Sequence, residues 1–312
     1  MTDLSLVAVD WGTTSFRLWA LTGTGHLLSQ RQGGLGMSRL KPADFQAVLA
    51  ENLAALGVGD RVPVIICGMA GAAQGWHEAP YVDLPVALTA LPQHAVRVPG
   101  LRRDVRILPG LAQRTMAAPD VMRGEETLLL GALLTDAVDG AVCLPGTHSK
   151  WVSINDGRVT RFSTAMTGEL FDLLANRSTL SHFIQAAQDG EKQAPAFEAA
   201  VRQALAAPER ILQTLFSVRA LPLLMGADQA GDLSARLSGL LIGLELSALR
   251  NAKPERVTLI SGGALTQNYR QAFQIAGIAC HELDADQMAR AGLFHAARAI
   301  WSYALKGQKE IT

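Results

Sequence analysis

Two short turns rich in glycine and threonine are the first candidates for chemistry in this sequence. GTTS occupies residues 12–15, just after an apolar run that ends in Asp10, and GTHS occupies residues 146–149. Such turns expose backbone N–H groups and hydroxyls, and a polyphosphate accepts several such donors at once. The candidate phosphate-binding residues are Gly12, Thr13, Thr14, Gly146 and Thr147.

Asp10 is a lone carboxylate beside the first turn. It suits a phosphate site when Mg²⁺ lies between the two, because this ion takes one or two carboxylates together with phosphate oxygens. We therefore expect Asp10 to hold Mg²⁺. The alternative is a solvated turn Asp that caps its own loop.

Two further features lie beside these turns. His148 and Lys150 flank the second turn, where donor or cationic side chains would stabilise the charge of a transferring phosphoryl group; exposed residues at a strand end are the alternative. Gly262 and Gly263, in SGGAL, follow an apolar strand. Paired glycines let a flat ring approach the backbone, so they are candidates to face adenine. A tight strand-to-helix turn would explain them equally well.

Two adjacent acids, Glu125 and Glu126, begin the apolar helix of MRGEETLLLG. Acids in the first turn of a helix are favoured by its dipole, which is one explanation. The other is catalytic: a carboxylate here could accept the proton of a hydroxyl that attacks a γ-phosphorus. The pattern does not decide which of the two glutamates would do so.

The substrate candidates are Arg17 and the loop 69–81, within GMAGAAQGWHEAPYVDLP. Arg17 could reach a ligand carboxylate, or pair with a surface acid. Loops of small residues beside polar and aromatic side chains often line pockets, which makes Met69, Trp76 and Tyr81 candidates. Ordinary turn packing is the alternative for this loop.

The elements that must position these residues repeat along the chain. Residues 4–9 predict a buried strand, and the alternation over 15–21 predicts a second, followed by a glycine turn and a third. The pattern restarts at residue 141 with strand, small-residue turn, strand, an NDG hairpin turn and a third strand. We therefore expect two homologous halves, residues 1–135 and 136–312, with a helical insertion at about 165–225 in the second.

Bulk composition excludes several classes of protein. The 312 residues carry 28 basic and 28 acidic side chains and only 5% aromatics, which argues against nucleic acid or an anionic membrane as partner. The three cysteines are far apart, no signal peptide precedes the first strand, and no apolar run could span a bilayer, so we expect a cytoplasmic protein. P-loop, Rossmann, zinc and nucleophile-elbow motifs are absent. The helical insertion could carry a homodimer interface.

Five motifs together resemble the actin-like ATPase and sugar-kinase superfamily: VAVDWGTTSFRLW, MRGEETLLLGA, LPGTHSKWVSI, LISGGALTQNY and ARAGLFHAARA. They are similar to its first phosphate motif, first connecting helix, second phosphate motif, adenosine motif and second connecting helix. The resemblance implies an α/β fold of two ribonuclease H-like domains with an interdomain cleft for ATP and Mg²⁺. It also implies that Leu144, where the first half has Asp10, leaves one half without a metal carboxylate.

Over nearly its full length the chain resembles sugar-acid kinases of galactonate catabolism. That likeness implies transfer of the γ-phosphoryl group of ATP to the 6-hydroxyl of 2-dehydro-3-deoxy-D-galactonate. Related sugar kinases carry a catalytic Asp after a glycine on the first connecting helix; Glu125 after Gly124 holds that position here. Phosphatase relatives also carry a Gly-Glu-Glu run, so the rival interpretations are a phosphoanhydride hydrolase of the same fold and a non-catalytic ATP-gated regulator.

Overall fold

The computed structural model describes residues 4–184, 193–226, 232–251 and 254–301. Contacts divide the chain into two compact units, which are described separately below. Unit 1 comprises Met1–Gly140, Val152–Ser163 and Asp284–Thr312, and unit 2 comprises Ala141–Trp151 and Thr164–Leu283. Both units are therefore discontinuous in sequence, and the last helix, α11 (Ala285–Ile300), belongs to unit 1.

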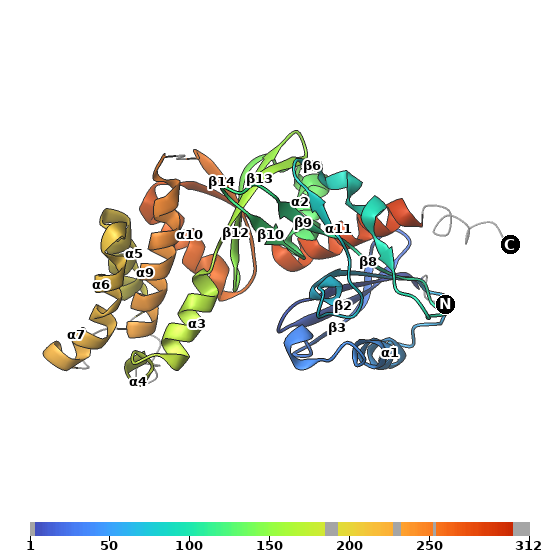
Figure 1. Ribbon diagram of the computed structural model, residues 1–312, viewed down its shortest axis with the longest axis horizontal. Helices are drawn as coiled ribbons and strands as arrows, with labels where there is room; N and C mark the ends of the chain where they lie inside the picture. Colours follow the sequence, from blue (N-terminus) through green and yellow to red (C-terminus); the bar gives the residue numbers. More distant parts are fainter. Residues whose placement is uncertain (1–3, 185–192, 227–231, 252–253, 302–312) are drawn as a thin grey trace. The chain divides into compact units, whose positions relative to one another are not determined.

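Unit 1 contains a mixed six-stranded sheet (Figure 1). Its three predicted N-terminal strands form an antiparallel meander, and the next two strands along the sheet run parallel to the first. In order across the sheet the strands are β3 (Leu27–Gly33), β2 (Phe16–Thr22), β1 (Leu4–Trp11), β4 (Val64–Gly68), β8 (Val105–Ile107) and β7 (Val96–Arg97). The carboxyl ends of β1, β4 and β8 therefore meet at one edge, where loops can gather functional groups.

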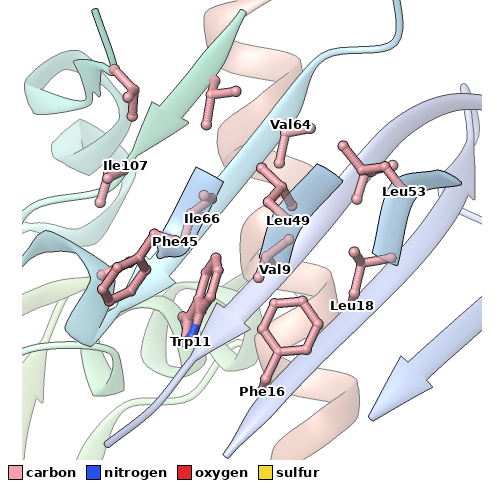
Figure 2. Packing of buried hydrophobic residues seen from close by; sticks show 14 of the residues in the cluster. Val9, Trp11, Phe16, Leu18, Phe45, Leu49, Leu53, Val64, Ile66 and Ile107 are labelled. Carbon is pink, nitrogen blue, oxygen red and sulfur yellow. The ribbon is translucent and has the colours of Figure 1, made fainter. Parts of the chain in front are cut away.

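Helix α1 (Phe45–Ala55) covers one face of this sheet. Alternate residues of β1, Val9 and Trp11 among them, point to this face because side chains of a strand alternate in direction. Figure 2 shows them against Phe45, Leu49 and other apolar residues, and the rings of Trp11 and Phe45 lie 4.7 Å apart between centroids. This packing fixes the end of β1, and with it the position of Asp10.

The other face of the sheet contacts α11, which packs along α2 (Glu125–Asp136) (Figure 1). The two helices cross where Gly131 faces Met288 and Gly292 faces Thr127. A side chain at either glycine would overlap the opposing backbone, so the helices approach closely enough to exclude one. This contact holds the first turn of α2 against α11, the helix that contacts the sheet.

Short elements complete unit 1. A second, three-stranded sheet has the order β10-β9-β5. Its strands and the remaining short elements are β5 (Tyr81–Asp83), β9 (Gly110–Gln113), β10 (Asp120–Met122), and the 3₁₀ helices η1 (Met37–Arg39), η2 (Met69–Gly71) and η3 (Leu88–His94).

The second large sheet repeats the order of the first. Its meander, predicted from residue 141 onward, is present, and the parallel pair β11 and β14 takes the place of β1 and β4. Across this sheet the strands are β15 (Ala279–Asp284), β14 (Arg256–Ser261), β11 (Gly140–Leu144), β12 (Ser149–Asn155), β13 (Arg158–Ala165) and β6 (Val86–Ala87). Five strands have the same order in the two sheets, and each meander has a Gly-Thr turn after its first strand, which agrees with an internal repeat.

Most of unit 2 is helical. The long apolar helix α9 (Leu233–Ser247) packs closely along α5 (Gln193–Ala206), with α3 and α10 beside them (Figure 1). The other helices are α3 (Thr167–Arg177), α4 (Ser181–Ile184), η6 (Pro208–Arg210), α6 (Ile211–Leu215), α7 (Ser217–Met225), η7 (Ala248–Asn251) and α10 (Ala264–Ala276). Within the described residues, no helix is long and apolar enough to cross a bilayer.

Candidate active site

Asp10 lies near the carboxyl end of β1, opposite Cys67 of the parallel strand β4. Its Oδ2 accepts a hydrogen bond from Arg17 Nη1 at 3.1 Å, and its Oδ1 lies 3.7 Å from Cys67 Sγ. Burial raises the pKa of Asp10 above 3.8, and the Arg17 guanidinium opposes that rise. The carboxylate is thus fixed in direction by a cation on the neighbouring strand.

The first Gly-Thr turn follows directly. The Gly12 amide donates a hydrogen bond to Ser15 O at 2.9 Å. Two further backbone hydrogen bonds hold the turn: Met37 N donates to Gly12 O, and Ser38 N donates to Thr13 O. Thr13 and Thr14 are exposed. The turn therefore presents its hydroxyls to solvent from a backbone that is held in place.

Glu126 is fully buried in the first turn of α2. Its carboxylate accepts hydrogen bonds from the Gly124 amide at 2.7 Å and the Thr127 hydroxyl at 3.1 Å. Burial, reinforced by the neighbouring charge of Glu125, raises the pKa of Glu126 to about 8. The side chain acts as a neutral cap for its own helix start at neutral pH.

Glu125 lies beside it and is only partly buried. Its Oε2 accepts a hydrogen bond from the Arg123 amide at 3.0 Å. Gly124 has φ 110°, a conformation that favours glycine, and a Cβ there would lie 3.3 Å from Gly68 Cα. Helix α2 therefore begins against the end of β4. The pKa of the Cys67 thiol at this end is raised chiefly by burial and further by the charge of Asp10.

The Arg17 guanidinium forms ion pairs with two carboxylates. Besides the contact with Asp10, its Nε lies 3.1 Å from Asp286 Oδ1 at the start of α11. Of the two interpretations offered by the sequence, pairing with an acid is the one seen in unit 1. Substrate binding by Arg17 remains a prediction.

The loop 69–81 begins with η2 and ends at β5. Met69 and Trp76 are partly buried, and the Trp76 ring stacks on Phe45 with centroids 6.2 Å apart. Tyr81 lies under the Arg123 guanidinium, 4.3 Å from its ring centroid, and Arg123 Nη2 donates to Ala79 O at 2.8 Å. The loop is thereby joined to the residue that precedes the two glutamates. Arg123 did not stand out in the sequence.

Unit 2 places its predicted groups at one sheet edge. Cys143 of β11 is in register with Leu259 of the parallel strand β14, so the turn at 145–148 and Gly262–Gly263 both follow carboxyl ends of neighbouring strands. Thr147 and His148 are exposed, and His148 Nε2 lies 2.6 Å from Glu169 Oε2 of α3. Lys150 is buried and its Nζ donates to His148 O at 2.9 Å, so its ammonium contacts the turn from beneath.

A cavity of about 370 Å³ opens at this edge of unit 2. It falls in the size range of small-molecule sites. Its lining combines the second Gly-Thr turn with the starts of three helices, including Gly146, Thr167, Asp232, Ala264, Asn268 and Tyr269. The predicted phosphate turn and the helix after the paired glycines thus share one pocket.

Glu245 of α9 is a buried carboxylate beneath this pocket. It accepts hydrogen bonds from Ser149 Oγ (2.7 Å), Trp151 Nε1 (2.8 Å) and Tyr269 Oη (2.7 Å), and from the Thr167 hydroxyl. These donors come from β12, α3 and α10. In the sequence, Glu245 is the acid in the apolar run LSGLLIGLELSAL, a pattern that is typical of a buried helix and indicates no chemistry.

The sequence offers one carboxylate, Asp10, as a candidate metal ligand. Among the described residues no group of three or more His, Cys, Asp or Glu side chains is placed to hold an ion. A protein cage is not required for Mg²⁺ bound to a nucleotide, because phosphates and waters supply most of its ligands. A single partly accessible carboxylate, such as Asp10, fits that mode of binding.

The sheet order and solved structures first define the class of this protein. The "Activator of the 2-Hydroxyisocaproyl-CoA Dehydratase" of Clostridium difficile, with bound ADPNP, matches over 98% of both chains with a TM-score of 0.52 at 13% identity, which shows a shared fold. Together with the repeated meander, this likeness shows an α/β fold of the kind that the sequence predicted.

The family follows from relatives of higher identity. A family model described as "2-keto-3-deoxy-galactonokinase" matches residues 10–296, and the chain belongs to this family. The "Probable 2-dehydro-3-deoxygalactonokinase DgoK1" of Rhizobium meliloti (strain 1021) is 47% identical over 94% of this chain and 97% of its own. The "2-dehydro-3-deoxygalactonokinase" of Escherichia coli (strain K12) is 36% identical over 94% and 98%. A crystal structure from Sinorhizobium meliloti, under the same kinase name, covers 95% and 97% with a TM-score of 0.90 at 47% identity.

Proposed function

We propose that this protein is an ATP-dependent kinase that phosphorylates the 6-hydroxyl of 2-dehydro-3-deoxy-D-galactonate. Family membership supports the substrate and the reaction. The observation on which the proposal chiefly rests is the pocket of unit 2, which joins the second Gly-Thr turn to the helix that follows Gly262 and Gly263. A glycine of the phosphate turn and the start of the helix after the paired glycines line one cavity, which suits a nucleoside triphosphate.

The proposal assigns phosphate contacts to both turns. In unit 1, Gly12, Thr13 and Thr14 offer amides and exposed hydroxyls. In unit 2, Gly146, Thr147 and His148 do the same, and Lys150 adds a positive charge beneath the turn. Gly262 and Gly263 would face the nucleoside. Preorganised donors of this kind stabilise charge that develops on a transferring phosphoryl group.

Asp10 would hold the Mg²⁺ that accompanies ATP, directly or through water. The bound ion would neutralise phosphate charge during transfer. Arg17 fixes the direction of the Asp10 carboxylate through the 3.1 Å contact, so its first role is to position that group. The free cysteines Cys67, Cys143 and Cys280 suit a reducing cytoplasm.

Glu125 is the better candidate for the general base. Both carboxylate oxygens of Glu126 already accept hydrogen bonds within its own helix start, and its pKa of about 8 leaves it largely protonated at neutral pH. Glu125 is partly accessible. Its carboxylate would accept the proton of the 6-hydroxyl as that oxygen bonds to the γ-phosphorus and the bond to ADP breaks.

The test is ADP release from ATP and Mg²⁺ with a panel of 2-keto-3-deoxy sugar acids, with mass analysis of the product. We expect release that depends on the acceptor and a product one phosphoryl group heavier. Equal ADP release without any acid would instead identify a hydrolase. Nucleotide-dependent assembly without a phosphorylated product would identify a regulator.

A further inference from the structure

Arg123 is a buried cation whose guanidinium is only partly hydrogen-bonded. The residue lies between β10 and α2 and is 9% exposed. Nη2 donates to Ala79 O, whereas Nε and Nη1 are buried and donate to no group in the described part of the chain. Three N–H donors thus lack an acceptor. Buried donors without partners are rare in folded proteins and point to a missing ligand, ion or water.

An aromatic ring and a buried acid make up part of the electrostatic surroundings of Arg123. The face of Tyr81, 4.3 Å away, offsets part of its desolvation. Glu126 lies close enough to interact electrostatically but is largely protonated at neutral pH. Glu125 Oε2 accepts a hydrogen bond from the backbone amide of Arg123 at 3.0 Å. An arginine keeps its charge, so a buried one calls for an anion.

We propose that Arg123 binds the carboxylate of the sugar-acid substrate and so selects acids over neutral sugars. This inference rests on the proposed function and names the recognition group for its substrate class. Arg123 adjoins the proposed base Glu125 and contacts the substrate loop through Ala79 and Tyr81. Arg17, the other arginine considered, is already engaged by Asp10 and Asp286.

Binding requires a small movement of the loop 69–81. A Cβ at Gly71 would lie 2.9 Å from Arg123 Nη1, so the loop covers this donor closely. The substrate carboxylate occupies the position beside Nη1 that the loop covers in this structure. Tyr81 keeps the guanidinium plane in position by stacking on it. The cost of leaving the donors buried without an acceptor is relieved when the anion binds, which favours the acid over an uncharged analogue.

The decisive measurement is preference between the acid and its carboxamide, titrated calorimetrically without ATP. Wild type should bind 2-dehydro-3-deoxy-D-galactonate at least tenfold more tightly than the carboxamide, because charge-assisted hydrogen bonds are lost with the amide. Arg123→Met should abolish this preference, and Arg123→Lys should restore part of it. The matched control is Arg114→Met, which removes an exposed arginine paired with Asp83 in the same unit and should keep the preference.

Two further readouts separate the possible outcomes. Arg123→Met should leave the Kd for ATP within about twofold and should not lower the Tm, because a buried cation without a carboxylate partner can be replaced by an apolar residue of similar length at little cost. An unchanged acid preference in Arg123→Lys and Arg123→Met overturns the inference, as does weakened ATP binding with the preference intact. A wild type that binds the acid but transfers no phosphoryl group refutes the proposed function and leaves this inference standing.

Discussion

At the scale of single residues, the two adjacent glutamates at the start of α2 have opposite surroundings. Glu126 is enclosed and capped, whereas Glu125 is partly exposed beside Arg123. The sequence left open which of them would be the base, because neighbours in a helix carry identical chemistry until burial separates them. The three-dimensional surroundings favour Glu125.

We predict that Glu125→Gln lowers kcat for phosphoryl transfer by about 100-fold or more, because the amide cannot accept the hydroxyl proton. The KM for ATP should stay within about threefold. Steady-state kinetics with varied ATP and sugar acid would measure both. Glu126→Gln is the comparison and should retain much more activity; a larger loss in that variant would reverse the assignment.

Glu126 also makes a prediction about stability and pH. Its folded pKa of about 8 lies above the unfolded value near 4.5, so between these values the native state holds a proton that the unfolded chain releases. Its contribution to the free energy of unfolding is therefore greatest at low pH and is lost as pH rises through the folded pKa. The decrease should amount to several kcal/mol, at about 1.4 kcal/mol for each unit of pKa shift.

Glu126→Gln removes this titration. Urea unfolding from about pH 5 to 8 should give a flatter profile than wild type, since the amide does not ionise. Glu51→Gln, on an exposed position of α1, should keep the wild-type slope. Parallel profiles for wild type and Glu126→Gln would show that the carboxyl titrates normally in the folded protein.

At the scale of elements, the carboxylate of Glu245 joins four segments of unit 2. It accepts hydrogen bonds from β12, α3 and α10 while lying on α9. These elements line or support the cavity that we assign to the nucleotide. Such a group keeps the turn before β12 and the start of α10 at a fixed separation.

We predict that Glu245→Gln lowers the free energy of unfolding by about 2 kcal/mol, because an amide supplies one acceptor where the carboxylate supplies two oxygens to four donors. The KM for ATP should rise more than the KM for the sugar acid. Denaturant titration and kinetics would measure these effects. Glu198→Gln, in an exposed ion pair on α5, is the control and should change neither. Equal rises in both KM values would contradict a role confined to the nucleotide pocket.

At the scale of the whole molecule, one strand pattern builds two sheets, and each sheet carries a Gly-Thr turn after its first strand. The proposal assigns a phosphate-binding role to each turn. Gly146 provides a clean test, because a Cβ there meets no other atom within 4 Å. A methyl group at this position should leave the fold intact and obstruct only a ligand.

Gly146→Ala is therefore expected to raise the KM for ATP by about tenfold, while its Tm stays at the wild-type value. Differential scanning fluorimetry and kinetics would check this pair of results. Gly59→Ala, also free of neighbours within 4 Å but remote in sequence from both turns, is the control. An unchanged KM would exclude the second turn from the phosphate site.

The sequence by itself determined the elements and their repeat. Apolar alternation, small-residue turns and hairpin signals are local properties, so the two meanders, the helix of Glu125 and the buried helix of Glu245 could all be predicted from nearby residues. The likeness to sugar kinases came from the same local motifs. The candidate residues Asp10, Glu125 and Glu126 were also predicted from local motifs.

Only the tertiary structure decided how each charged group is partnered. Arg17 meets Asp10 through strand register and Asp286 from the last helix, Glu245 collects donors from residues 149 to 269, and Arg123 is buried against a loop more than forty positions earlier. Burial and hydrogen bonding between distant segments set pKa values and leave donors paired or unpaired. These are properties of packing, and no local pattern in the chain encodes them.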